Sequence, residues 1–482
     1  CKNFIGGKWV ESKSTRRKTL VDPAGLEPLG EVPESTPEEV SQAIAAAQHA
    51  FADWSNACVK DRVQYLFRFN ALIDKHIDEL SDILVAEHGK MLPDAKGDVQ
   101  RGKEVVEFTT GMPDVLGGEA LFDVATHVDV RMAREPIGVT AGATPYNFPA
   151  MIPLWMLPMS IACGNTFILK PSDLTPLTSI RLVQLLEETG LPAGVVNLVH
   201  GAKGVMDVLM DDPRVKAISF VGSSAVAEQV YTRSAAAGKR VLALGGAKNH
   251  LVVMPDADVD KTAAAVINSA FGCTGQRCMA ASVLILVGTR YEQNRFFSPI
   301  VDRAAALRLG HGRYPQKYDM GPLTTAALRD RVERYVNIGI QEGATLFHDG
   351  RNVRSADYPR GFFVGATIFD NVHSKMAIAQ DEIFGPVLAV IRTDTLDEAI
   401  EIENRNPYGN AASIFTSNGG AARTFARRAC SGMIGVNVGV PVPRDPYAFG
   451  GWNRSALGAG DITGNSAVRF WTRDKKITER WF

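Results

Sequence analysis

From Ile137 onward, short runs of β-branched and apolar residues alternate with segments of helical periodicity. Between 137 and 221 the runs are Ile137–Ala143, Thr166–Leu169, Val195–Val199 and Ala217–Val221. A helical stretch, Ser179–Thr189, separates the second run from the third, and this spacing predicts βαβ units in a parallel sheet. A further alternation from about Leu251 to the 440s, with Val387–Ile391 and Ala412–Phe415 as strands, predicts a second α/β domain.

Upstream of these strands the pattern is helical. Thr36-Pro37-Glu38-Glu39 combines an N-cap hydroxyl, a proline at the first helical position and a capping-box glutamate, which predicts a helix start. A second helical pattern runs from about Asp61 to His88 and ends at Gly89. The apolar run Phe148–Cys163 is shorter than the roughly 20 residues that a bilayer requires, so it predicts a buried core helix and no membrane span.

Charge and cysteine content narrow the function classes. Across 482 residues, 52 Lys and Arg face 53 Asp and Glu, and a net charge of −1 argues against a general nucleic-acid binder. Six irregularly spaced cysteines do not form a disulfide framework, so we expect a reducing compartment: the cytoplasm, or the mitochondrial matrix in a eukaryote. Cys273 and Cys278 lack the spacing of metal ligands and the nine histidines are scattered, so no metal is predicted.

The segment GCTGQRCMA, residues 272–280, places Cys278 in a glycine-rich turn after an apolar helical pattern. A lone intracellular cysteine is more often a packing residue than a nucleophile. Four other segments change that balance: PYNFP at 145–149, LKPS at 169–172, FVGS at 220–223 and EIFGPV at 382–387. In this order and at these separations, the five segments resemble the aldehyde dehydrogenase superfamily along almost the whole chain.

The resemblance implies a role for each matching residue. Cys278 is the nucleophile that attacks an aldehyde carbon, and the Asn147 amide joins the Cys278 backbone N–H in holding the oxyanion. Glu382 binds the nicotinamide ribose, and Phe148 and Phe384 lie beside the cofactor. The enzyme implied is therefore a dehydrogenase that uses a nicotinamide cofactor.

The remaining cofactor residues follow from the same resemblance. Lys170 and Asp173 match positions that hold the adenosine ribose, where a carboxylate favours NAD over NADP. Gly222 and Ser223 open a helix whose N-terminus faces the pyrophosphate. For Asp173 the alternative is a solvated loop carboxylate.

One departure from the family pattern bears on the product. Most hydrolytic members carry a glutamate in a Glu-Leu-Gly-Gly segment, which activates water to hydrolyse the thioester. This chain reads Leu242-Ala243-Leu244-Gly245-Gly246, with Ala243 at the glutamate position, so water attack is expected to be slow. Coenzyme A, as a co-substrate, could accept the acyl group instead.

A closer resemblance supports that acceptor. GAKNH at 246–250, GQRCMA at 275–280, PAMIPLWM at 149–156 and IGVN at 434–437 look like the CoA-acylating methylmalonate-semialdehyde dehydrogenases. That subfamily oxidises methylmalonate or malonate semialdehyde, releases CO₂ and forms propionyl-CoA or acetyl-CoA. Arg277 precedes the nucleophile and Arg101 matches a second arginine of the subfamily, so the pair is expected to bind the substrate carboxylate.

The resemblance also implies an α/β, aldehyde dehydrogenase-like fold of two Rossmann-like parallel-sheet domains with a small β oligomerisation element. Residues 1–117 and 137–246 would form the NAD-binding domain, residues 247–445 the catalytic domain, and residues 118–136 and 464–482 the oligomerisation element of a homotetramer or dimer. The apolar residues of that tail, among them Val468, Phe470 and Trp481, could dock on another subunit or on their own chain.

Two alternatives stay open. The first is a hydrolytic NAD-dependent dehydrogenase of another small acidic aldehyde, such as succinate semialdehyde or a sulfonated analogue, with Trp452 and Arg454 facing that substrate. The second is a catalytically silent binding protein that retains the fold, against which the intact Cys278, Asn147 and Glu382 argue.

Overall fold

The four strands predicted between residues 137 and 221 lie side by side in one eight-stranded sheet. The computed structural model, which describes residues 1–482, orders this sheet β2-β1-β9-β8-β7-β10-β11-β21. The five strands from β9 to β11 are parallel, and only the outer pairings are antiparallel. In sheet order the strands are β2 Lys8–Val10, β1 Asn3–Ile5, β9 Val196–Leu198, β8 Thr166–Lys170, β7 Val139–Ala143, β10 Val215–Val221, β11 Arg240–Leu244 and β21 Ala456–Gly458.

The strand order reverses at β7, because the chain runs from β7 outward to β8 and β9 and then returns to place β10 on the other side of β7. Ligands bind α/β sheets at the carboxyl ends of the strands that flank such a switch point. The residues that follow these ends are Thr144–Phe148 after β7 and Gly222-Ser223 after β10. The topology therefore brings two of the predicted motifs to one crevice.

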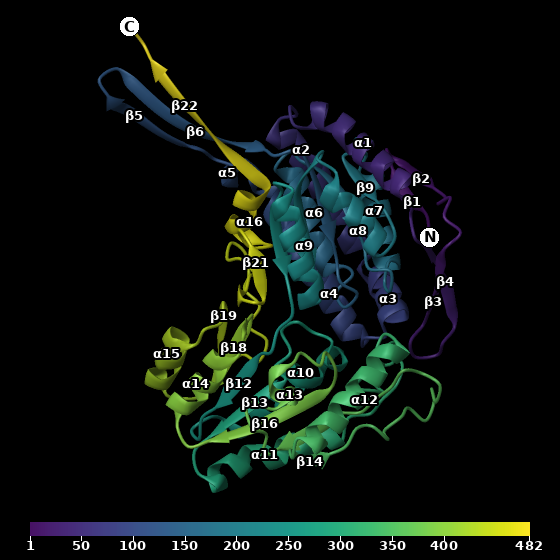
Figure 1. The fold of residues 1–482 in the computed structure, drawn as a ribbon, viewed down its shortest axis with the longest axis vertical. Helices are drawn as coiled ribbons and strands as arrows, with labels where there is room; N and C mark the ends of the chain where they lie inside the picture. Colours follow the sequence, from purple (N-terminus) through teal and green to yellow (C-terminus); the bar gives the residue numbers. More distant parts are fainter.

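The helices of this lobe (Figure 1) are α1 Pro37–Trp54, α2 Val59–Lys75, α3 Ile77–His88, α4 Leu92–Thr110, α5 Met112–Val115, α6 Met151–Ala162, α7 Leu177–Glu188, α8 Lys203–Asp211, α9 Ser224–Ala236 and α16 Gly464–Trp471. The predicted start of α1 is confirmed, since Thr36 accepts from the Glu39 N–H and Glu39 accepts from the Thr36 N–H. The single helix predicted over 61–88 is wrong: it breaks at His76, whose backbone (φ −110°, ψ 17°) leaves the helical region. Gly89, at φ 88°, ends the second piece as predicted.

Helix α6 is buried along almost its whole length, which confirms the prediction of a core helix. Its side chains join the hydrophobic cluster on one face of the eight-stranded sheet, whereas α1 and α8 pack in the cluster on the other face. No helix in the structure combines the length and the apolar character needed to cross a membrane.

The second lobe is built on a seven-stranded sheet ordered β14-β15-β16-β13-β12-β18-β19, parallel except for the β14–β15 pair. Its strands are β12 His250–Val253, β13 Val283–Val287, β14 Thr345–His348, β15 Thr367–Asp370, β16 Val387–Thr393, β18 Ala411–Phe415 and β19 Met433–Val436. Its helices are α10 Val259–Phe271, α11 Arg290–Ala305, α12 Ala326–Gln341, α13 Ala377–Gln380, α14 Leu396–Arg405 and α15 Gly419–Arg428. Two parallel-containing sheets, each with its own helices, confirm the predicted α/β fold class.

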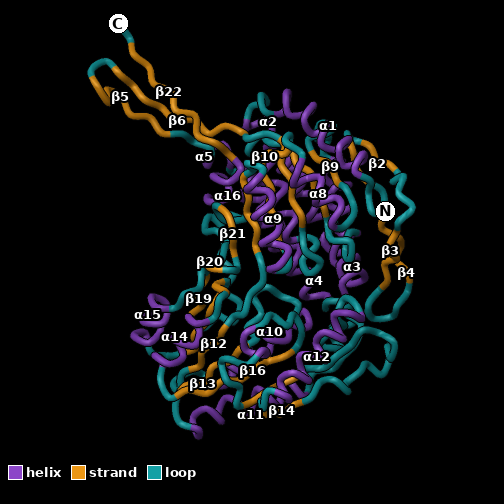
Figure 2. The backbone as a smooth tube through the Cα atoms, viewed as in Figure 1, coloured by secondary structure: helices purple, strands orange, loops and turns teal.

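Three strands project from the first lobe as an arm (Figure 2): β5 Glu119–Ala125, β6 Val128–Pro136 and β22 Thr472–Arg480. Strand β22 pairs antiparallel with β6 along its full length, from Thr472 opposite Pro136 to Arg480 opposite Val128. The apolar tail divides at the arm's base, because Val468 and Phe470 are buried on their own chain in α16 while Trp481 is exposed beyond β22. Two small antiparallel pairs complete the fold: the hairpin of β3 Arg17–Val21 with β4 Pro28–Pro33, and the pairing of β17 Tyr408–Gly409 with the distant β20 Trp452–Asn453.

Candidate active site

The turn that carries Cys278 begins where α10 ends. Residues 272–275 form one 3₁₀ turn in which Cys273, Thr274 and Gly275 all have positive φ (49°, 58° and 71°). Non-glycine residues in this region store backbone strain, which persists only where the surroundings hold it. A side chain on Gly275 would come within 2.3 Å of the Gly385 carbonyl, so glycine lets this turn lie directly on the segment that carries Glu382 and Phe384.

The backbone of Cys278 is held by side-chain amides. Asn249 and Asn410 both donate to the Cys278 carbonyl oxygen, at 2.8 and 2.9 Å. Burial, followed by the negative charge of Glu382, raises the pKa of the Cys278 thiol to about 12. The thiol is therefore protonated in this resting arrangement, and its attack needs a proton acceptor or a change in the surrounding charge.

Asn147 approaches the same turn from the other lobe. It follows strand β7, and its Nδ2 donates to the Gln276 carbonyl oxygen at 2.9 Å. An amide nitrogen carries two hydrogens, so one donor remains after this bond. This contact could not be predicted from the sequence, because Asn147 and Gln276 are 129 positions apart and meet only where the two lobes are in contact.

Cys278 and Asn147 both line a cavity of about 390 Å³ at the switch point of the eight-stranded sheet. Seven of the predicted cofactor and catalytic residues other than Cys278 line it: Asn147, Phe148, Asp173, Gly222, Ser223, Glu382 and Phe384. Lys170 is the exception, because it lies buried beside the cavity with its Nζ donating to the Pro171 carbonyl at 3.1 Å. Burial lowers the pKa of Lys170 to about 8, although Asp173 opposes that shift.

The donor set of this cavity fits a dinucleotide. Helix α9 starts at the cavity wall, and its N-cap residue Ser223 makes no side-chain cap, so its first-turn N–H groups remain available to a phosphate. Glu382 is fixed at the opposite end by the Ala247 N–H, which donates to its Oε1 at 2.9 Å. A side chain on Gly246 would meet the Glu382 carboxylate at 2.5 Å, so glycine is needed for this approach.

Asp173 does not present a free carboxylate at the cavity wall. Its Oδ2 accepts from Lys18 Nζ at 2.8 Å, and Lys18 comes from the β3–β4 hairpin of the N-terminal segment. Both side chains are partly exposed, so this pair is worth at most about 1 kcal/mol. Lys18 could not be identified from the sequence, because a single lysine in a short strand gives no sign of a role at a cofactor site.

A second cavity, of about 330 Å³, meets the first at Cys278. Cys278, Phe148 and Ile152 line both cavities, so the nucleophile lies where they join. The predicted arginines Arg101 and Arg277 line the second cavity, together with Arg444, Asp94, Asp98, Trp155 and Phe449. The aromatic walls and the three guanidinium groups make this cavity suited to a small anion.

The two predicted arginines are not free, contrary to what their predicted role as carboxylate receptors suggests. Arg277 Nη2 donates to Asp94 Oδ1 at 2.6 Å, and its Nη1 donates to the Asn268 carbonyl. Arg101 pairs with Glu104, one turn along α4, and donates to the Pro443 carbonyl at 3.0 Å. The Arg101–Glu104 pair could have been predicted, because residues three apart are neighbours on a helix. No local pattern indicated the pair of Arg277 with Asp94.

The side chains of β11 around the predicted base position point to two faces of the sheet. Side chains alternate along β11, so Ala243 points into the cluster formed with α1 and α8. Leu242 and Leu244 point into the opposite cluster, against which Cys278 and Phe148 pack. Neither Ala243 nor Leu244 can accept a proton, and the match of Ala243 to the family's glutamate stays a prediction.

Trp452 and Arg454 do not line either cavity. Trp452 is more than half exposed, and Arg454 pairs with Glu228 of α9. Arg444 and Phe449 of the same loop line the second cavity instead. Only the first half of this loop therefore lines a candidate substrate cavity, and its contact with a substrate stays a prediction.

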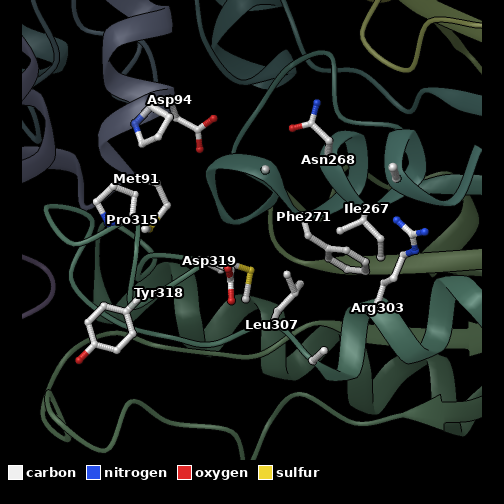
Figure 3. A pocket seen from close by; sticks show the side chains of 15 residues that line it. Met91, Asp94, Ile267, Asn268, Phe271, Arg303, Leu307, Pro315, Tyr318 and Asp319 are labelled. Atoms are coloured by element: carbon white, nitrogen blue, oxygen red, sulfur yellow. The ribbon is translucent and has the colours of Figure 1, made fainter. Parts of the chain in front are cut away.

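A third cavity, of about 590 Å³, lies beyond the second and does not touch Cys278 (Figure 3). Asp94, Pro93 and Asn268 line both, so the Asp94–Arg277 pair lies at their boundary. Figure 3 shows Asp94 at one wall, with Asn268 and Phe271 of α10 at another. The site has no group of three or more His, Cys, Asp or Glu side chains arranged for a metal ion.

The chain is similar to known proteins along its whole length. A malonate-semialdehyde dehydrogenase from Geobacillus kaustophilus (strain HTA426) is 47% identical over 480 residues, covering 100% of this chain and 98% of the relative. A crystal structure of methylmalonate-semialdehyde dehydrogenase from Oceanimonas doudoroffii superposes with a TM-score of 0.97 at 43% identity, covering 100% and 98% of the two chains. A protein from Sinorhizobium meliloti 1021 in complex with NAD, provisionally named a methylmalonate-semialdehyde dehydrogenase, also gives 0.97, at 42% identity over 99% of this chain and 97% of that one. The model of the aldehyde dehydrogenase family matches residues 9–477, and this chain belongs to that family.

Proposed function

We propose that this enzyme oxidises malonate or methylmalonate semialdehyde with NAD, releases CO₂ and transfers the acyl group from Cys278 to coenzyme A. The observation that carries the proposal is the junction at Cys278, where the cavity lined by the predicted cofactor residues meets a second cavity walled by three arginines. The products are propionyl-CoA from methylmalonate semialdehyde and acetyl-CoA from malonate semialdehyde.

The residues at the junction divide the first half of the reaction among them. Cys278 Sγ forms a bond to the aldehyde carbon, and the carbonyl oxygen becomes an oxyanion. The free N–H of Asn147 and the backbone N–H of Cys278 donate to that oxyanion, and one such donor is typically worth about 10²–10³ in rate. Collapse of the adduct expels the aldehyde hydrogen with its electron pair and leaves a thioester on Cys278.

Support for NAD comes from the cavity and from a relative. The N-terminus of α9 would hold the pyrophosphate, Glu382 the nicotinamide ribose, and Lys170 with Asp173 the adenosine ribose. When bound, NAD accepts the electron pair and hydrogen that leave the aldehyde carbon. The similar protein from Sinorhizobium meliloti, which is complexed with NAD, supports this assignment.

The second half of the reaction follows from the absence of a base. Ala243, at the position that matches the family's glutamate, and its neighbour Leu244 cannot activate water, so hydrolysis of the thioester is slow. The thiol of coenzyme A instead attacks the thioester carbon, loses its proton and releases Cys278. Loss of CO₂ breaks the bond between the carboxylate and the adjacent carbon, which then takes up a proton.

Arg277 and Arg101 bind the substrate carboxylate in this proposal. Each guanidinium has five N–H donors, and each uses two of its nitrogens in bonds to the protein, so further donors remain for a ligand. Relatives named malonate-semialdehyde dehydrogenase, at 45–47% identity along the full chain, support an acidic aldehyde as substrate.

The domain roles complete the proposal. Residues 1–117 and 137–246 bind NAD, residues 247–445 carry the nucleophile, and the arm with the C-terminal tail, 118–136 and 464–482, joins subunits into a tetramer or dimer. Exposed apolar side chains on the arm, Leu121, Phe122 and Trp481, support its use as an interface.

Omission of coenzyme A tests the proposal directly. NADH formation from malonate semialdehyde is measured with and without coenzyme A, and the product is identified by mass. We expect multiple turnovers and acetyl-CoA only when coenzyme A is present, with at most one NADH per Cys278 in its absence. Equally fast turnover to a free acid without coenzyme A would refute the acylating chemistry and favour a hydrolytic dehydrogenase.

A further inference from the structure

We propose that the buried ion pair of Lys90 and Asp98 positions the Asn147 amide for catalysis. Neither residue belongs to the motifs that identify the family. Both are positioning residues in this inference, since they act through Asn147, and the inference rests on the proposed role of Asn147 as oxyanion donor.

Lys90 makes three contacts in this one region. Its Nζ donates to Asp98 Oδ2 at 2.8 Å and to the Asn147 carbonyl oxygen at 2.7 Å. The same Nζ lies 4.2 Å from the centre of the Phe148 ring, which lines both cavities at Cys278. Two of the three ammonium donors thus hold Asp98 and Asn147, and the charge lies over the neighbouring aromatic ring.

Asp98 holds the other end of the same segment. Its Oδ1 accepts from the Met151 N–H at 2.7 Å. Met151 is the first residue of α6, and the N-cap position of that helix, Ala150, supplies no side-chain cap. A carboxylate at a helix N-terminus satisfies a free N–H and opposes the positive end of the helix dipole. Asp98 thus caps α6 from the neighbouring helix α4.

The pair therefore holds the segment 147–151 by a hydrogen bond at each end. Lys90 fixes the backbone of Asn147, and Asp98 fixes the first turn of the helix that follows. Both side chains are fully buried (0% exposed), so water does not weaken either bond. A buried ion pair adds little to folding stability, since apolar residues of the same size stabilise a protein equally well. Its hydrogen bonds do, however, fix the direction and distance of the groups that they hold.

Direction and distance are what an oxyanion donor needs. Misplacement of a catalytic group by about 1 Å can cost about 10²-fold in rate. The Asn147 side chain is held at its tip by Gln276, and Lys90 holds its backbone. Without Lys90, only the Gln276 bond would set where the free N–H points.

The test compares kcat for aldehyde oxidation in Lys90→Met, Asn147→Ala and the double variant. Lys90→Met keeps an unbranched side chain, one atom shorter, and removes its charge. The matched control is Lys103→Met, on the helix α4 that carries Asp98, where a buried lysine pairs with Asp74 at 3.1 Å and with Glu107, away from residues 147–151. Each variant is also assayed for the KM of NAD and for alkylation of Cys278 by iodoacetamide, which builds no oxyanion.

We expect Lys90→Met to lower kcat by about 10²-fold, while the KM of NAD and the alkylation rate stay within about twofold of the wild type. In the Asn147→Ala background, Lys90→Met should add no more than about twofold, because the donor that it positions is already gone. Lys103→Met should leave kcat within the same range.

Several results would overturn the inference. One is a kcat for Lys90→Met that matches the control. Another is a double variant whose loss equals the product of the single losses, and a third is alkylation that falls in parallel with oxidation. If Asn147→Ala itself lost nothing, the oxyanion role would fail, which is a separate outcome from failure of Lys90 alone. Should Lys90→Met not fold because Asp98 is left as a lone buried charge, the neutral double variant Lys90→Met/Asp98→Asn takes its place in every comparison.

Discussion

Replacing Leu244 by glutamate puts a carboxylate into the cluster against which Cys278 packs, and Ala243→Glu, one residue earlier, is the matched control in the cluster on the opposite face. A carboxylate near the thioester can take a proton from water, and general base catalysis contributes about 10²–10⁴-fold. We therefore expect Leu244→Glu to form NADH from malonate semialdehyde over many turnovers without coenzyme A. Ala243→Glu should remain dependent on coenzyme A.

Both variants lose stability, for reasons that the burial of each site makes explicit. Leu244 is only 5% exposed, so its removal forfeits about 1.5–3 kcal/mol of hydrophobic burial. Burial of a carboxyl group without a partner adds about 1–3 kcal/mol. Ala243 is fully buried, so a glutamate there also has to displace its neighbours. Thermal unfolding of both proteins is recorded first, and activity is compared well below the lower midpoint.

The pH profile of Leu244→Glu tests whether the new carboxyl group acts as the base. Burial raises the pKa of a carboxyl group, and a general base works only when ionised, so the coenzyme A-independent rate should rise with pH through that pKa. The product is identified as a free acid by mass. The reasoning about the strand's alternation is refuted if Ala243→Glu, and not Leu244→Glu, gains the coenzyme A-independent rate, or if a folded Leu244→Glu gains none.

Three further predictions follow from the site. Glu382→Gln removes a charge that raises the pKa of Cys278, so the pH profile of iodoacetamide alkylation should move to lower pH and the rate at pH 8 should increase; an unchanged profile would contradict the assigned cause. Arg277→Gln should lower kcat/KM for malonate semialdehyde by about 10–10²-fold, the worth of a charge-assisted hydrogen bond, and lower it much less for propanal; equal losses would argue against carboxylate binding. Deletion of residues 472–482 removes β22 but leaves α16 in the core, so sedimentation should show a smaller, folded assembly, whereas an unchanged mass would exclude the arm as an interface.

The sequence was sufficient for the features that depend on neighbouring residues. Strands β7, β8 and β10 could be predicted from their apolar runs, and the start of α1 could be predicted from the capping pattern at Thr36. Both signals lie in neighbouring residues. Cys278 and Asn147 were found through motifs, each of which is a contiguous string of residues. The break at His76 was missed because the apolar periodicity continues through it, and only its backbone angles show the turn.

The remaining features depend on contacts between distant residues. Arg277 meets Asp94 from 183 positions away, and Lys90 meets Asn147 from 57 positions away. A lysine after Gly89 or an aspartate in the first turn of a helix reads as an ordinary solvated charge until the fold buries it. The match of Ala243 to the family's glutamate is of a different kind. It rests on the motif alone, so it stays a prediction, and variants at positions 243 and 244 test it because neighbouring residues of a strand point to opposite faces.

The charges of the second cavity bear on the acidic aldehyde that the proposed function requires. The lining carries three cations, Arg101, Arg277 and Arg444, and two anions, Asp94 and Asp98, so one positive charge is in excess. A substrate with a single carboxylate would bring this lining to neutrality, whereas a neutral aldehyde would leave it charged. The ion pairs of Arg277 with Asp94, and of Arg101 and Arg444 with Glu104, also fix each guanidinium before the substrate arrives, so less side-chain entropy is lost on binding. In the proposed function, selectivity would therefore depend on arginines that are already held by anions rather than on two free arginines.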